Sequence, residues 1–126
     1  LRALVLRPGL RLEECRYPMD SKAVHFGVEA DGKILSIVTA HPEARFGESD
    51  WRIRGMATHP DWQGKGLGGK ALDALLNWGR SEGIPLFWCN ARERAIPFYL
   101  RFGFSVESAL FDIPGIGPHK VMKRAP

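Results

Sequence analysis

The alternation of apolar and polar residues in the first half of the chain predicts antiparallel strands. Two β-favouring segments, 24–30 and 33–40, are separated by Asp31-Gly32, a dipeptide that suits the two-residue turn of a β-hairpin. The polar stretch 41–49 contains proline and glycine and predicts a loop, after which a third strand is expected over 50–58. The pattern therefore predicts a hairpin followed by a neighbouring strand.

The residues before the hairpin carry a different pattern. Leu1, Leu4 and Val5 recur at helical spacing until Pro8, which predicts the last turns of an amphipathic helix whose beginning is missing. The segment 7–21 contains no recognisable motif, and we expect it to be a loop.

The second half of the chain predicts helices that alternate with strands. Apolar residues follow a 3.6-residue period over 67–83, which predicts the longest helix of the chain. A short, continuously apolar segment, 85–90, predicts a strand buried on both faces. A short helix is expected over 95–102, with Pro97 in its first turn and Gly103 as its C-terminal cap. Two closing strands are expected, over 104–111 and 119–123.

Composition favours a single globular domain, 1–126. Of the 126 residues, 44% are apolar and 25% are charged. The net charge of +4 is small and the basic residues are scattered, so we expect no nucleic-acid partner. No apolar stretch approaches the ~20 residues that span a bilayer, which predicts no membrane segment. Two cysteines are too few for a disulfide framework, so we expect a cytoplasmic protein.

A glycine-rich turn, 63–69, joins the third strand to the long helix and carries the candidate chemistry. Glycines remove the Cβ atoms that block close approach, so successive N–H groups suit a pyrophosphate, and the following helix adds its positive end. The P-loop template needs a hydroxyl where Ala71 stands, and the dinucleotide template needs an acid where Asn90 stands. Both nucleotide templates are therefore weakened. A tight strand-to-helix turn without a ligand is the structural alternative.

A third template, Q/R-x-x-G-x-G/A, is satisfied by Gln63, Gly66 and Gly68 directly after a strand. Together with the flanking segments, the turn resembles the GCN5-related N-acetyltransferase family; those segments are Ile53-Arg54-Gly55-Met56-Ala57-Thr58-His59-Pro60, Asn90, Ala95, Phe98-Tyr99 and Gly103-Phe104. The resemblance covers roughly half of the chain and implies an α+β (α/β three-layer) fold, with a mixed, mostly antiparallel central sheet and helices on both faces. The family fold opens with a strand before its first helix, and we expect either that this first strand is missing from this chain or that the edge of the sheet is built differently.

The resemblance also implies transfer of an acetyl group from acetyl-coenzyme A to a primary amine by direct attack in a ternary complex. Tyr99 would donate a hydrogen bond to the leaving thiolate, although it is also a candidate core aromatic, and Asn90 is also a candidate strand-end amide. The residues expected to bind the cofactor lie at the end of the third strand, in the turn and beyond it: Met56, Ala57, Thr58, Gln63, Gly64, Lys65, Gly66, Leu67, Gly68, Gly69, Asn90 and Tyr99.

The sequence contains no clear base for the acceptor amine. Glu48, at the start of the third strand, and His59, just after it, rank ahead of the other candidates. The four histidines are dispersed and no pair of ligand residues has metal-site spacing, so we expect no metal. The acceptor itself has no motif, and an incomplete sheet edge would favour a homodimer. A non-catalytic domain that binds or senses acyl-coenzyme A is the alternative function.

Overall fold

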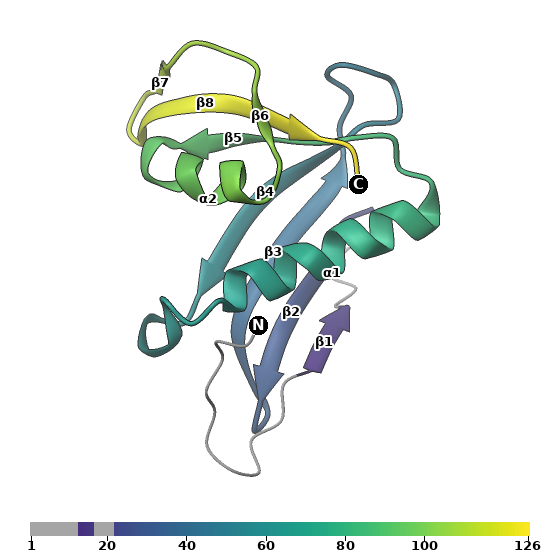
Figure 1. The fold of residues 1–126 in the computed structure, drawn as a ribbon, viewed down its shortest axis with the longest axis vertical. Helices are drawn as coiled ribbons and strands as arrows, with labels where there is room; N and C mark the ends of the chain where they lie inside the picture. Colours follow the sequence, from purple (N-terminus) through teal and green to yellow (C-terminus); the bar gives the residue numbers. More distant parts are fainter. Residues whose placement is uncertain (1–12, 17–21) are drawn as a thin grey trace.

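The computed structural model describes residues 13–16 and 22–126. These residues form one sheet with the strand order β1-β2-β3-β4-β5-β8-β6, and β7 pairs with β8 (Figure 1). Two α-helices, α1 (Leu67–Glu82) and α2 (Ile96–Arg101), and two short 3-10 turns, η1 (Pro60–Trp62) and η2 (Glu93–Ala95), complete this part of the chain. The strands are β1 (Glu13–Arg16), β2 (Val24–Ala30), β3 (Lys33–Pro42), β4 (Trp51–Thr58), β5 (Phe87–Arg92), β6 (Ser105–Val106), β7 (Phe111–Ile113) and β8 (Gly117–Arg124).

The predicted hairpin is confirmed. Ala30 of β2 pairs with Lys33 of β3, and the two residues between them, Asp31 and Gly32, have φ angles of 51° and 74°. Two consecutive positive φ angles are what a tight hairpin turn requires, because they match the twist of the flanking strands. The local sequence therefore sets the register of β2 against β3.

The expected loop over 7–21 is wrong in part, because it contains β1. This strand pairs antiparallel with β2 and forms one end of the sheet. Its sequence, EECR, has no apolar alternation that would have predicted a strand. Backbone pairing to β2, which no local pattern reveals, accounts for it.

The long helix α1 is confirmed, and the buried core explains it. Its apolar stripe includes Leu72 and Leu75, which are fully buried against the sheet, and Gly83 ends the helix with a φ of 74°. Gly79 faces β5: a Cβ at this position would lie 2.5 Å from the Phe87 ring. The helix therefore lies closer to the sheet than any larger residue at this position would allow.

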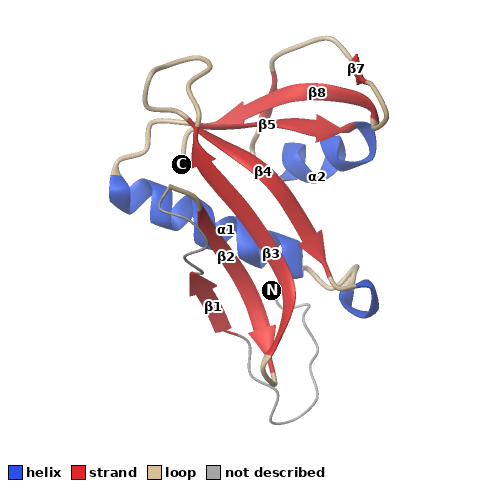
Figure 2. Cartoon of the chain, turned by 180° about the vertical axis from the view of Figure 1, so that it is seen from behind, coloured by secondary structure: helices blue, strands red, loops and turns tan. Residues whose placement is uncertain are grey.

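The two helices cover the same face of the sheet. Both lie in front of it in Figure 1 and behind it in Figure 2, which shows the opposite side. All strand pairs are antiparallel except β4 with β5, so the expectation of a mixed, mostly antiparallel sheet is confirmed. The predicted N-terminal helix, and with it the expectation of helices on the second face, lies outside the described residues.

The closing strand expected over 104–111 is divided into β6 and β7. The Glu107 N–H still donates to the Val121 carbonyl at 2.8 Å, but the Val121 N–H donates to the Ser108 hydroxyl at 2.9 Å. A side chain thus takes the position of a backbone carbonyl, and the β6 ladder ends. Before it, Gly103 closes α2 as expected, with a φ of 83°.

Candidate functional site

The two parallel strands at the centre of the sheet separate from each other. Only Trp51 with Phe87 and Arg52 with Trp88 are paired; beyond them β4 continues along β3 while β5 continues along β8 (Figure 2). The edge of β4 that faces β5 therefore carries backbone groups without a ladder partner. A gap of about 320 Å³ lies between the strands, lined by Ile53, Arg54, Gly55, Met56, Cys89, Asn90, Ala91, Arg92, Arg94, Ala95 and Tyr99.

The gap is lined from both faces of the sheet. Cys89 of β5 forms a hydrogen bond with Tyr99 of α2, so its side chain lies on the helix-covered face. Side chains alternate along a strand, and Asn90 therefore lies on the opposite face. Two reactants would thus be able to approach the gap from two sides.

The glycine turn follows β4 directly and leads into α1. Gly64 and Gly66 have φ angles of 79° and 82°, which favour glycine. The Gln63 amide donates to the Thr58 carbonyl at 3.3 Å and ties the turn to the end of β4. Gly66 is the N-cap of α1, and no side chain caps the helix there. The first N–H groups of α1 are therefore left to other partners.

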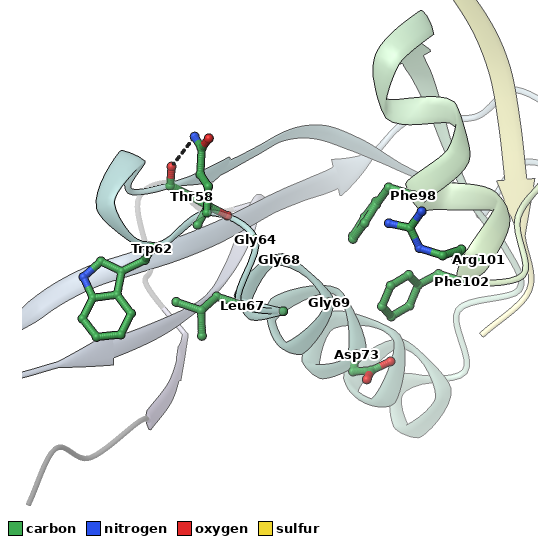
Figure 3. Close-up of a pocket in the computed structure, with 12 residues that line it drawn as sticks. Thr58, Trp62, Gly64, Leu67, Gly68, Gly69, Asp73, Phe98, Arg101 and Phe102 are labelled. Atoms are coloured by element: carbon green, nitrogen blue, oxygen red, sulfur yellow. Dashed lines mark hydrogen bonds between the residues drawn. The ribbon is translucent and has the colours of Figure 1, made fainter. Parts of the chain in front are cut away.

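A second hollow, of about 470 Å³, lies at this turn. Figure 3 shows Phe98 and Arg101 of α2, with Phe102 directly after it, on one side of the N-terminus of α1 and Trp62 on the other. The described residues that line it are Thr58, Trp62, Gln63, Gly64, Gly66, Leu67, Gly68, Gly69, Asp73, Phe98, Arg101 and Phe102. Most of the expected cofactor residues are thus brought together here, while Met56, Asn90 and Tyr99 line the gap. Ala57 and Lys65 line neither space.

Five residues of this hollow were not among the expected cofactor residues: Trp62, Asp73, Phe98, Arg101 and Phe102. Two of them, Phe98 and Arg101, belong to α2 and Phe102 directly follows it, far along the chain from the turn. Gly69 explains how α2 comes so close, because a Cβ there would lie 2.5 Å from the Phe102 ring. Gly68 is different: its Cβ would be 3.6 Å from the Met56 methyl group, an ordinary contact.

Tyr99 lies at the inner wall of the gap and is 6% exposed. Burial raises the pKa of its phenol well above the usual range, and the adjacent Cys89 adds to the shift. The hydrogen bond between the two side chains raises the pKa of Tyr99 and opposes the rise in the pKa of Cys89, which fits a phenol that donates to the sulfur, a weak acceptor. Tyr99 is therefore a protonated hydrogen-bond donor at any physiological pH.

Comparison with known proteins was consistent with this geometry. The profile described as "Acetyltransferase (GNAT) family" matches residues 5–104. This chain belongs to the GNAT family.

The acetyltransferase is also similar to individual proteins. It is 33% identical over 127 residues to the uncharacterized N-acetyltransferase YitI of Bacillus subtilis, covering 97% of this chain and 85% of the relative. In fold it resembles a putative N-acetyltransferase from Lactobacillus plantarum, with a TM-score of 0.73, 19% identity, and coverage of 82% of this chain and 68% of the other. It also resembles the PaiA N-acetyltransferase of Thermoplasma acidophilum, solved with coenzyme A, with a TM-score of 0.67, 18% identity, and coverage of 83% and 62%.

The two residues considered as bases lie away from the gap of this acetyltransferase. Glu48 is exposed in the loop before β4, at the end where β4 and β5 are paired. His59 accepts the Asp61 N–H at 3.1 Å and caps η1. Neither residue lines the gap or the hollow.

Within the described part of this acetyltransferase, no helix is long and apolar enough to cross a membrane. The same residues contain no group of three or more His, Cys, Asp or Glu side chains placed to hold a metal ion.

Proposed function

We propose that this acetyltransferase moves an acetyl group from acetyl-coenzyme A to a primary amine, by direct attack of the amine in a ternary complex. One observation carries the proposal: a buried, protonated Tyr99 lines the gap between β4 and β5, at the end of which the glycine turn lies. The gap supplies the place for transfer, and the turn supplies the place for the cofactor's phosphates.

The hollow at the glycine turn would bind the pyrophosphate. N–H groups of the turn 63–69 and of the first turn of α1 would donate to its oxygens, and the helix dipole favours the negative charge. Arg101, whose guanidinium lies 6.0 Å from the centre of the Phe98 ring, would add a positive charge from α2. Hydrogen bonds to charged acceptors contribute about 1.5–3 kcal/mol each, so a few of them would dominate cofactor affinity.

The pantetheine arm would then lie along the edge of β4. Past Arg52 this edge has no partner in the ladder, so its N–H and C=O groups would pair with the amides of the arm as a neighbouring strand does. Met56 and Asn90 would flank the arm, and the thioester would reach Tyr99.

The chemistry requires one bond to form and one to break. The amine nitrogen bonds to the acetyl carbon, the carbon–sulfur bond breaks, and the products are an N-acetyl amine and coenzyme A. Tyr99 would move its hydrogen bond from the neutral Cys89 sulfur to the thiolate as negative charge develops there, which stabilises the transition state more than the substrate. A phenol is ~1.5 pKa units weaker as an acid than a thiol, so a hydrogen bond rather than early proton transfer is expected.

The amine must be neutral to attack. For a lysine-like amine of pKa ~10.4 this costs about 4.6 kcal/mol at pH 7, against about 1 kcal/mol for an α-amine of pKa ~7.7. Because Glu48 and His59 lie outside the gap, we propose that water at its open end takes the proton.

The test measures binding and transfer separately. Calorimetric titration with acetyl-coenzyme A is expected to show saturable binding, and Arg101→Gln to weaken it by about tenfold. Release of the coenzyme A thiol is expected only when an amine from a panel is added. Saturable binding without transfer to any amine would instead favour the acyl-coenzyme A-binding or sensing domain.

A further inference from the structure

Three arginines surround the open end of the gap between β4 and β5. Arg54 belongs to β4, Arg92 ends β5 and Arg94 lies in η2; all three are exposed and line the gap, and we call them the gap arginines. Arg92 and Arg94 also line an adjoining hollow of about 470 Å³, together with Glu93, Ile116 and Pro118. The two spaces therefore share a positively charged wall.

The gap arginines face little negative charge. Among the described residues that line the gap and the adjoining hollow, Glu93 is the single carboxylate. Elsewhere on this part of the sheet, cations have acidic partners: Arg52 lies 3.3 Å from Glu43, and the Lys123 ammonium lies 3.6 Å from Glu107. Within residues 22–126, no carboxylate forms an ion pair with a gap arginine.

The cofactor does not account for these charges. Arg92 shares the face of β5 with Asn90, because residues two apart on a strand lie on one side, and that face is opposite the helices. The glycine turn and Arg101 line a separate hollow with α2. A second anion at the open end of the gap would meet the gap arginines instead.

We propose that the acceptor is a small amine that also carries an oxyanion, either a carboxylate or a phosphate, and that the gap arginines bind this group. The inference rests on the proposed function, because the acceptor would reach the thioester through this gap. Guanidinium groups suit such oxyanions, which they bind with paired N–H donors. Spaces of about 320 and 470 Å³ suit a small molecule.

The same charges would assist the attack. A positive potential favours the neutral form of a nearby amine, and pairing the oxyanion with arginine removes the negative charge that would otherwise stabilise the ammonium form. Polycationic amines would be repelled by the same wall. The gap arginines would thus select the acceptor and favour its reactive form.

The test compares anionic, uncharged and polycationic amines, including two pairs that differ only in one carboxylate charge. Acetylation rates are measured for L-alanine with L-alaninamide, β-alanine with β-alaninamide, aminoethylphosphonate and spermidine. For at least one anionic amine, we expect kcat/KM to exceed the values for the corresponding amide and for spermidine by about tenfold or more. Arg54→Gln, Arg92→Gln and Arg94→Gln are each expected to lower this preference, with the KM for acetyl-coenzyme A unchanged.

A matched control removes the same charge from the same face. Arg45 is exposed and its guanidinium lies 5.2 Å from the centre of the Trp88 ring, at the end where β4 and β5 are paired. Arg45→Gln is expected to leave the preference for anionic amines unchanged. An equal loss in this variant would mean that only the net charge matters and would overturn the inference.

Other outcomes separate this inference from the proposed function. Transfer that is equal for anionic and uncharged amines, or fastest with spermidine, would overturn the inference and leave the acetyltransferase reaction intact. A raised KM for acetyl-coenzyme A in the gap variants would assign these arginines to the cofactor and also overturn it. If no amine is acetylated, the proposed function fails, and the melting temperature of the protein with coenzyme A then tests the inference. A melting temperature that rises when an anionic amine is added, and that no longer rises in the gap variants, supports the inference. No rise with any anionic amine overturns it.

Discussion

Burial sets the chemistry of two side chains at the wall of the gap, Tyr99 and Cys89. Both are removed from water, which disfavours their charged forms, so the pKa of each is raised. The pKa of the Cys89 thiol rises from 9.0 to about 12, which makes it a poor nucleophile. Tyr99 keeps its proton and remains a donor. Of the two, Tyr99 is the residue suited to stabilise charge during acetyl transfer.

Replacing Tyr99 by phenylalanine tests this role at the scale of one atom. The ring and its contacts with Phe98 and Phe104 are retained, while the hydroxyl is lost. We expect kcat to fall by about tenfold or more, since general acid and hydrogen-bond catalysis contribute about 10²–10⁴-fold. The affinity for acetyl-coenzyme A, measured by calorimetry, should change little. An unchanged kcat would leave Tyr99 as a core aromatic only.

At the scale of the elements, the glycines in and before α1 have different structural roles. Gly64 and Gly66 have positive φ angles that shape the turn before the helix. Gly69 and Gly79 lie inside the helix, where the absence of a Cβ lets α2 and β5 approach. Gly68 lines the hollow and has ordinary contact distances. The glycine-rich sequence is therefore both a candidate phosphate turn and a packing surface.

Two alanine substitutions distinguish Gly69, which packs closely against Phe102, from Gly68, which has no neighbour closer than an ordinary contact. Gly69→Ala would place a methyl group against the Phe102 ring, and we expect it to lower the free energy of unfolding by about 1–3 kcal/mol. Gly68→Ala meets only ordinary contacts and the turn template admits alanine at this position, so both its unfolding free energy and its acetyl-coenzyme A affinity should change little. Urea unfolding and calorimetric titration measure the two quantities. Equal unfolding free energies in the two variants would contradict the assignment.

At the scale of the whole molecule, the separation of β4 from β5 opens a gap that residues of both faces of the sheet line. The helix-covered face holds the glycine turn and Tyr99, and the opposite face holds Asn90 and Arg92. The sheet remains continuous because β4 stays paired with β3 and β5 stays paired with β8. One fold thus provides a gap that both proposed reactants reach without sharing a binding surface.

The free energy of unfolding of the whole protein should depend on pH through the buried Cys89 thiol. The folded-state pKa of Cys89 is raised, so the folded protein holds a proton that the unfolded chain releases as the pH rises above 9.0. The unfolding free energy should therefore fall between pH 9.0 and about 12, by up to about 1.4 kcal/mol per pH unit from this group. Cys89→Ser removes the titration and should give a shallower decline in urea unfolding across this range. Parallel declines in the two proteins would contradict the raised pKa.

Several elements were predictable because their cause is local. The Asp31-Gly32 turn, the apolar stripe of α1 and the glycine caps act over a few residues, and each was predicted correctly. The strand β1 and the division between β6 and β7 were not, because backbone pairing with β2 and the Ser108 hydroxyl determine them. Local patterns carry no information about such partners.

For the site, the sequence by itself determined the glycine turn, its place between a strand and a helix, and the family to which the chain belongs. Tertiary structure alone decided which other residues reach that turn and the gap. Arg101 at the end of α2 and Phe102 directly after it reach the turn, and the gap arginines meet at the open end of the gap because β4 and β5 separate there. Spacing along the chain fixes a turn or a helix face, but convergence of distant segments depends on packing across the whole sheet.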